Sequence, residues 1–222
     1  MNEREIESRV AELLSSLPEY VMLAAAAKTR TPQEVQAAVR GGVKIVGYNY
    51  VQEAERMYEV IGNQVKWHMI GHLQRNKAKH AVELFDMIET IDSVRLAEAV
   101  DRRCANIGKV MPVLIEINSG REANKSGVMP EEVEALVKEI SPLKHMRVQG
   151  LMTMGPFFDD PEKTRPYLKA TKELFDRLSE AQIENVQMRY LSMGMSDTYE
   201  IAIEEGANIV RIGTRLFGER PY

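Results

Sequence analysis

Cysteine is scarce in this sequence, because Cys104 is the only one among 222 residues. A single thiol forms no disulfide within the chain, and we therefore expect a reducing, cytoplasmic setting. Long apolar runs are missing as well: the longest extends only from Val21 to Ala27, whereas a helix that spans a bilayer needs about 20 apolar residues. No apolar segment follows the first five residues, so we expect neither a secretory signal nor a membrane partner.

An excess of positive charge is also missing. The 29 lysines and arginines are outnumbered by 33 aspartates and glutamates, which gives a formal net charge of −4. This balance disfavours nucleic acid as a partner. Apolar residues make up 44% of the chain and charged residues 28%, which is typical of a folded globular protein and argues against general disorder.

What the sequence does contain is a regular alternation of short apolar stretches with amphipathic repeats. The apolar stretches predict strands at residues 20–27, 43–49, 66–70, 87–91, 110–117, 148–154, 188–193 and 209–212. The repeats of helical period predict helices at residues 6–17, 31–40, 51–61, 73–84, 93–104, 130–140, 168–178 and 196–205.

The first apolar stretch needs a decision between strand and helix. Its four alanines, at residues 24–27, favour a helix by propensity. Pro18 and the pair Thr31-Pro32 leave too little room for a stable helix, so we predict a buried strand. Thr31 then begins the next helix, because Glu34 completes a capping box and proline suits the first turn.

Strands that alternate with helices predict right-handed βαβ units and a parallel sheet. Eight such units predict an α/β fold in the form of a single TIM-type (β/α)8 barrel, with residues 1–222 as one domain. Little chain follows the eighth strand, so the helix at residues 6–17 is expected to complete the outer ring. The alternative is an open, doubly wound sheet.

The chemistry of a parallel barrel is expected at the C-terminal ends of its strands. Lys28 directly follows the first apolar stretch. Partial desolvation of its amine would lower the pKa, as a Schiff-base lysine requires. The alternative is a lysine whose amine simply reaches water at a strand end.

Two loops predict a phosphate site. Gly194-Met195-Ser196 follows the seventh predicted strand, and Gly213-Thr214 follows the eighth. Barrels often bind phosphate in these two loops, through backbone N–H groups and a helix N-terminus. The alternatives are a helix cap for Ser196 and a packing role for Gly213.

Arg211 shares a face of the eighth predicted strand with Gly213, and we expect its side chain to point into the barrel. A buried arginine needs a partner, which is either a carboxylate or a ring nitrogen of a cofactor. A lysine for an aldehyde, a cradle for a phosphate and an arginine for a ring nitrogen together describe pyridoxal 5′-phosphate (PLP).

The sequence also resembles a known family, the pyridoxal phosphate homeostasis proteins (YggS/PROSC-type), in motifs that follow one another over nearly the whole chain. The motifs are AAKT at residues 26–29, GYNYVQE at 47–53, WHMIGHLQRNK at 67–77, KSG at 125–127, GLMTM at 150–154, LSMGMSD at 191–197 and VRIGTRLFG at 210–218. The resemblance implies a barrel like that of alanine racemase with covalently bound PLP.

The resemblance also implies roles for individual residues. The cofactor-binding set is Lys28 for the Schiff base, Arg211 for the pyridine nitrogen, Ser196, Gly213 and Thr214 for the phosphate, and Asn49 near the ring, with Met195 beside Ser196. The family usually has glutamate where Tyr48 stands and often serine where Ala27 stands, so the polar surroundings of Lys28 differ here. Tyr48 alternates with Asn49 along the second strand, and we expect it to pack outside the pocket.

Binding of PLP does not imply catalysis. Racemisation needs an acid/base group on each face of the bound substrate, and in the racemases the resemblance places the second group, a tyrosine, in a further domain for which we expect no room before Tyr222. An arginine at the ring nitrogen also keeps PLP a weaker electron sink. We therefore expect a PLP homeostasis protein without strong catalytic activity. The alternatives are a slow or narrow amino-acid racemase and, without PLP, a Schiff-base aldolase or phosphosugar isomerase.

Further expectations concern partners and metals. Apo forms of PLP-dependent enzymes are candidate recipients of the cofactor, and the barrel is expected to be a monomer or weak dimer. We expect no metal site, because Gly71 separates His68 from His72 and breaks their helical spacing. His68 is expected to be a polar group satisfied in the core.

Overall fold

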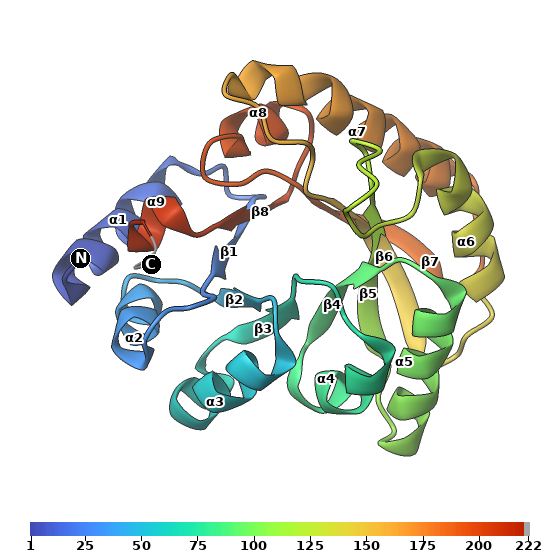
Figure 1. Cartoon of the computed structure of the whole chain (residues 1–222), viewed down its shortest axis with the longest axis horizontal. Coiled ribbons are helices and arrows are strands. Elements are labelled where there is room, and N and C mark those ends of the chain that lie inside the picture. Colours follow the sequence, from blue (N-terminus) through green and yellow to red (C-terminus); the bar gives the residue numbers. More distant parts are fainter. Residues whose placement is uncertain (220–222) are drawn as a thin grey trace.

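A computed structural model describes residues 1–219, and in it eight parallel strands close into a barrel in chain order (Figure 1). Tyr222, where the sequence stops, lies outside the described residues. The strands are β1 (Met22–Ala26), β2 (Ile45–Tyr48), β3 (Lys66–Met69), β4 (Met87–Ile91), β5 (Met111–Ile117), β6 (Met146–Thr153), β7 (Val186–Ser192) and β8 (Ile209–Ile212). The predicted (β/α)8 barrel is confirmed, and the open sheet is excluded because β1 pairs with β8.

Helices surround the barrel as an outer ring (Figure 1). The α-helices are α1 (Glu3–Ser16), α2 (Pro32–Arg40), α3 (Val51–Ile61), α4 (Ala78–Leu84), α5 (Val94–Asn106), α6 (Val133–Ile140), α7 (Arg165–Glu180), α8 (Tyr199–Glu204) and α9 (Thr214–Phe217). Short 3-10 turns lie at η1 (Gly62–Gln64), η2 (Arg75–Lys77), η3 (Pro130–Glu132) and η4 (Pro161–Thr164). None of the described helices is both long and apolar enough to cross a bilayer.

Local sequence signals set the first βα unit. Residues 22–26 form a strand despite their alanines, as predicted, and Ala24 and Ala25 are fully buried. At the start of α2 the Glu34 N–H donates to the Thr31 hydroxyl, and the Thr31 N–H donates to the Glu34 carboxylate 2.7 Å away. This capping box satisfies donors that the helix end would otherwise leave unpaired.

Side chains of the strands divide into an outer and an inner layer. The outer layer packs against the helices, and in it the rings of Tyr48 and Trp67 stack with centroids 5.7 Å apart. Tyr48 therefore lies outside the barrel, as its alternation with Asn49 predicted. Inside, small apolar clusters include Ala24, Ile45 and Ile209. Because neighbouring positions alternate between the layers, the inner face is left to a few apolar and several polar side chains.

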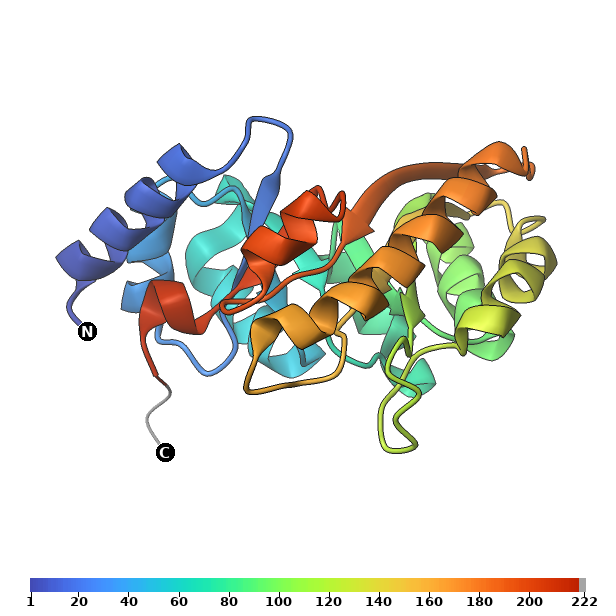
Figure 2. The same ribbon diagram turned by 90° about the horizontal axis from the view of Figure 1, so that it is seen from above.

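The outer ring is completed where the first and last strands meet. Helix α1 packs against α2 and α9, as expected for the opening helix, and the Arg9 guanidinium donates to the Arg215 carbonyl. Figure 2 shows α1 and α9 on the same side of the molecule. The short helix α9, which directly follows β8, was not predicted, because four residues give no helical repeat.

The start of α8 corrects one predicted boundary. The helix expected from Ser196 begins at Tyr199, and Ser196 lies in the preceding turn. The Met195 N–H donates to the Thr198 hydroxyl, 3.1 Å away, and the Met195 carbonyl accepts from Thr198 and Tyr199. This turn uses the short polar residues that periodicity had assigned to the helix, and Ser196 does not cap it.

Candidate functional site

Lys28 lies in the turn that follows β1, at the C-terminal end of the barrel, and is half-buried. The β1–β2 register pairs Ala26 with Gly47, and the Ala27 N–H donates to the Gly47 carbonyl 3.0 Å away. Continued along both chains, this register brings Lys28 and Asn49 to the same level of neighbouring strand ends. Two residues of the predicted set therefore share one edge of the barrel.

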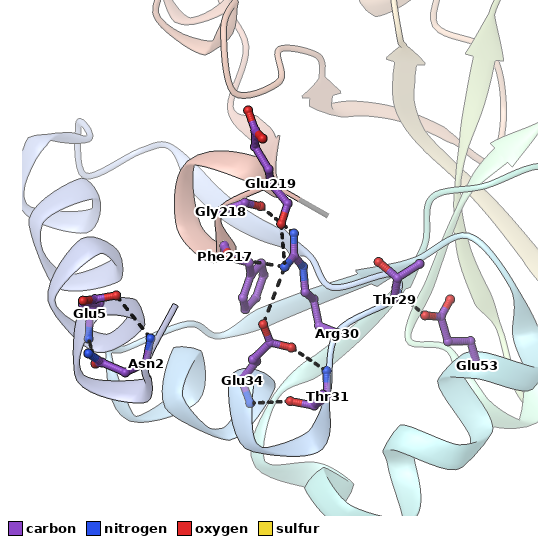
Figure 3. Close-up of polar contacts among 10 residues, drawn as sticks. All are labelled: Asn2, Glu5, Thr29, Arg30, Thr31, Glu34, Glu53, Phe217, Gly218 and Glu219. Atoms are coloured by element: carbon purple, nitrogen blue, oxygen red, sulfur yellow. Dashed lines mark hydrogen bonds and ion pairs between the residues drawn. The ribbon is translucent and has the colours of Figure 1, made fainter. Parts of the chain in front are cut away.

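The Lys28 turn is held in an uncommon backbone conformation. Thr29 has φ of 65°, in the left-handed region, which costs a β-branched residue about 1–3 kcal/mol and persists only where surroundings enforce it. Here the Thr29 N–H donates to the Glu53 carboxylate of α3 (Figure 3), and the Arg30 N–H donates to the Ala27 carbonyl. The position of Lys28 is thus fixed from both sides.

The loops after β7 and β8 meet beside β1. The Ser196 hydroxyl accepts a hydrogen bond from the Arg215 N–H at 3.3 Å, which joins the β7 loop to the start of α9, next to Thr214. Gly213 packs so closely on β1 that a Cβ placed there would lie 3.2 Å from the Ala26 carbonyl oxygen. The structure therefore brings the predicted residues Ser196, Gly213 and Thr214 together at the end of the barrel where Lys28 lies.

Arg211 points into the barrel, as predicted, and is only 3% exposed. Its guanidinium donates to the Ser192 hydroxyl and to the Thr153 carbonyl, each 2.7 Å away. The Ser192 hydroxyl in turn donates to the Glu89 carboxylate, 2.6 Å away. The carboxylate partner that a buried arginine needs is thus present, and the Ser192 hydroxyl connects the two groups.

Glu89 links this arginine to a buried histidine. Its second carboxylate oxygen lies 2.6 Å from His68 Nδ1, and Glu89 is fully buried. Burial by itself would raise the pKa of Glu89, but the hydrogen bonds from His68 and Ser192 and the charges of His68 and Arg211 lower it below the ordinary 4.5. His68 is a satisfied core group, as expected, and residues 1–219 contain no cluster suited to a metal.

A second buried carboxylate, Glu116 on β5, has a different environment. It is 7% exposed, and its Oε2 atom has no hydrogen-bond partner. Burial and the nearby charge of Asp92 raise the pKa of Glu116 to about 7, against the attraction of Arg211. The barrel interior therefore holds one acid that stays charged and another that titrates near neutral pH.

A cavity of about 290 Å³ opens over the strand ends and includes Glu116 in its wall. Of the predicted set, Asn49 and Met195 line this cavity, whereas the other five residues do not. The remaining wall comes mainly from the loops after β3, β5 and β6, with Gly71, Asn118, Lys125 and Phe157 among its members. The predicted residues thus divide between the cavity and the β7–β8–β1 side of the barrel end.

Sequence reasoning missed the interior carboxylates Glu89 and Glu116, and Ser192 with them. The signal that could have found them is an acidic residue inside a strand that is otherwise apolar on both faces. Such a side chain is buried at a cost unless it meets a cation or a donor. Arg211, the inward arginine predicted on β8, is a cation near these carboxylates.

The chain is similar to known proteins in sequence and in fold. Residues 3–221 match the family described as alanine racemase, N-terminal domain. An Aquifex aeolicus protein named pyridoxal phosphate homeostasis protein is 40% identical, with all of both chains covered. The structure of PipY from Synechococcus elongatus with PLP bound matches with a TM-score of 0.88 and 32% identity, over 96% of this chain and 100% of that one. A Clostridium difficile alanine racemase shares the fold, with a TM-score of 0.80 and 17% identity, over all of this chain and 60% of that one.

Replacing Glu89 tests the buried charge network. Because the folded state lowers its pKa, the carboxylate stabilises the protein above pH 4.5, and this contribution is lost as the pH falls through the lower folded value. We expect Glu89→Gln to reduce the free energy of unfolding by about 3 kcal/mol at pH 7. The difference between wild type and variant should become smaller below pH 4.5. Urea unfolding between these pH values measures the difference, and a difference independent of pH would contradict the assignment. Glu131→Gln, at an exposed carboxylate paired with Arg121, is the matched control and should change little.

We expect replacement of Glu116 to stabilise the folded protein, whereas replacement of Glu89 destabilises it. The folded state raises its pKa to about 7, so the protonated acid is favoured and the stability it contributes is lost as the pH rises from 4.5 through 7. We expect Glu116→Gln to raise the melting temperature of the cofactor-free protein at pH 8 and to leave it unchanged at pH 4. Equal shifts at both pH values would show that the side chain's size, not its charge, matters.

Proposed function

The chain belongs to the alanine racemase N-terminal domain family and, within it, to the pyridoxal phosphate homeostasis proteins, and we propose that it binds PLP and serves in intracellular PLP homeostasis. The observation that supports the proposal is the packing of Gly213 against Ala26, two residues before Lys28, together with the contact between Ser196 and the start of α9 and the buried Arg211 on β8. These groups match the aldehyde, phosphate and ring nitrogen of PLP.

The phosphate fits the loops after β7 and β8. Within residues 1–219, the N–H groups of Ser196 and Asp197 have no acceptor, and the Ser196 hydroxyl joins their turn to the start of α9, next to Thr214. Gly213 lets the backbone approach β1 closely, because a side chain at this position would fill the space. Free N–H donors, hydroxyls and a missing Cβ are what a phosphate dianion needs, so the residues present fit this part of PLP.

Arg211 supplies the group for the pyridine nitrogen. Ser192 and Thr153 orient its guanidinium, which has five donors and does not lose its charge near neutral pH. Burial lowers the pKa of Arg211, while the charges of Glu89 and Glu116 oppose that effect. A permanent cation donates to the ring nitrogen and keeps it unprotonated. Asn49 and Met195, which line the cavity, flank the ring on the open side.

Lys28 supplies the amine. Bound PLP offers an aldehyde that forms a Schiff base with a primary amine. The strained turn at Thr29 and the contact with Glu53 hold the Lys28 backbone at the barrel end. Lys28 therefore anchors the aldehyde side, while Ser196, Gly213 and Thr214 anchor the phosphate side.

The same geometry favours holding PLP over turning over a substrate. Racemisation needs an acid/base group on each face of the reacting carbon. Lys28 is one, but Tyr48, which directly precedes Asn49, is buried against Trp67 outside the barrel. The unprotonated ring nitrogen opposite Arg211 further weakens PLP as an electron sink. We therefore assign the chain a role without strong catalytic activity.

The proposal extends to the setting of the protein. The single thiol, Cys104, is buried among apolar residues, and burial raises its pKa to about 11. Such a thiol is suited to a reducing cytoplasm and forms no cross-link between copies. We place the protein in the cytoplasm as a monomer or weak dimer, with apo PLP-dependent enzymes as recipients of the cofactor.

Removal of the Lys28 amine tests the central assignment. We expect Lys28→Ala to fold normally and to lose covalent PLP, because the substitution removes the amine that we assign to the Schiff base. Borohydride reduction followed by mass spectrometry of the peptides locates the adduct. Lys66→Ala is the matched control, since Lys66 begins β3 at the opposite end of the barrel and pairs with Asp86. A wild-type adduct mapped to another lysine would overturn the role of Lys28.

Incubation with amino acids tests the absence of strong catalysis. We expect the PLP-loaded protein to racemise L-alanine no faster than free PLP at the same concentration, because Tyr48 is buried against Trp67 and does not supply a second acid/base group. Chiral chromatography of the products measures the rate. Turnover above that background, abolished by Lys28→Ala and not by Tyr48→Phe, would make the protein a racemase with another second base.

A further inference from the structure

Arg30 lies two residues after Lys28, and its side chain turns away from the site to the far end of α9. It is buried, and its guanidinium donates to the carbonyls of Gly218, Phe217 and Glu219 at 2.6, 3.2 and 3.4 Å (Figure 3). The guanidinium also lies 5.5 Å from the centre of the Phe217 ring. Its ion pair with Glu34, at 3.5 Å, ties the same group to the first turn of α2.

These contacts satisfy the carbonyls that a helix leaves unpaired at its C-terminus. Helix α9 has only four residues and cannot hold its own position by length. Its other end is held by the Ser196 hydroxyl, which accepts from the Arg215 N–H. Gly218 turns the chain at φ of 78° directly after the helix, so that its carbonyl meets Arg30.

Helix α9 is therefore fixed at one end by the β7 loop and at the other by the Lys28 turn. Thr214, of the proposed phosphate site, begins this helix, and Arg30 is separated from Lys28 only by the strained residue Thr29. A shift of the Lys28 turn is transmitted through Arg30 to α9, and a shift of α9 is transmitted back. The pairing of β1 with β8 sets the overall spacing of the two segments, and Arg30 adds a side-chain link between the Lys28 turn and the C-terminal end of α9.

We propose that Arg30 is a positioning residue that holds the Lys28 amine and the α9 phosphate loop at the separation which lets PLP engage both at once. The proposal rests on the PLP-binding function assigned above. Two linked anchors bind far more tightly than either alone only when their spacing matches the ligand. Arg30 accordingly matters for a ligand that has both an aldehyde and a phosphate, and not for one that has the aldehyde alone.

The test compares PLP with 5-deoxypyridoxal, which keeps the aldehyde and ring but lacks the phosphate. Dissociation constants of both are measured by visible absorbance at one pH for the wild type, Arg30→Gln and Arg30→Lys. We expect Arg30→Gln to weaken PLP binding about tenfold and to leave 5-deoxypyridoxal binding within about twofold of the wild type. Lysine keeps the charge but not the fork of donors, so Arg30→Lys should recover only part of the loss.

Controls separate this role from a merely structural one. Arg40→Gln removes a half-exposed arginine that joins α2 to Glu3 and Glu7 of α1 and does not reach α9; it should change neither constant. Melting temperatures show whether each variant folds, and Arg30→Lys carries the test if Arg30→Gln does not. Equal weakening of both ligands, or of neither, overturns the role of Arg30 while leaving the wild type a PLP-binding protein. Failure of the wild type itself to bind PLP would instead overturn the proposed function.

Discussion

A cation enclosed within the barrel governs the arrangement of its polar interior. Arg211 is nearly removed from water, and an unpaired guanidinium there would cost several kcal/mol. The chain meets that demand with Ser192, the Thr153 carbonyl and, through Ser192, Glu89. Four strands of the barrel thus contribute to one hydrogen-bonded chain that includes Arg211. The contacts that make burial of Arg211 possible also orient the side chain that we propose for the ring nitrogen of PLP.

The opposite side of the site depends on backbone geometry. Lys28 stands in a turn whose next residue, Thr29, is held in a left-handed conformation by Glu53. Arg30 then connects the turn to α9. The lysine is thus held by a helix on one side and by the chain's last described segment on the other. This explains how an exposed loop end can present an amine at a fixed place without a rigid element beneath it.

Much of the fold was predictable because each βα unit repeats the same signals. The apolar strand at residues 22–26, the Thr31 capping box and the inward direction of Arg211 all followed from local pattern and alternation. The partners of Arg211 did not, because Glu89 lies far from it in sequence and only barrel closure brings them together. Helix α9 and the turn at Ser196 were missed because four-residue elements carry no periodicity. The grouping of Ser196, Gly213 and Thr214 followed from the barrel rule, whereas the Arg30 contacts join segments far apart in the sequence and were not predicted.

Closure of the barrel has a consequence for when the protein acquires its function. Met22–Ala25 on β1 pair with Ile209–Ile212 on β8, so the seam joins the earliest strand to the latest. During synthesis the lysine emerges long before the arginine and the glycine that complete its surroundings. Contacts between such distant parts of a chain form late, since loop-closure entropy opposes them. A half-made chain on the ribosome therefore has Lys28 but not the β8 segment that packs beside it, and the barrel end is complete only after translation of the final βα unit.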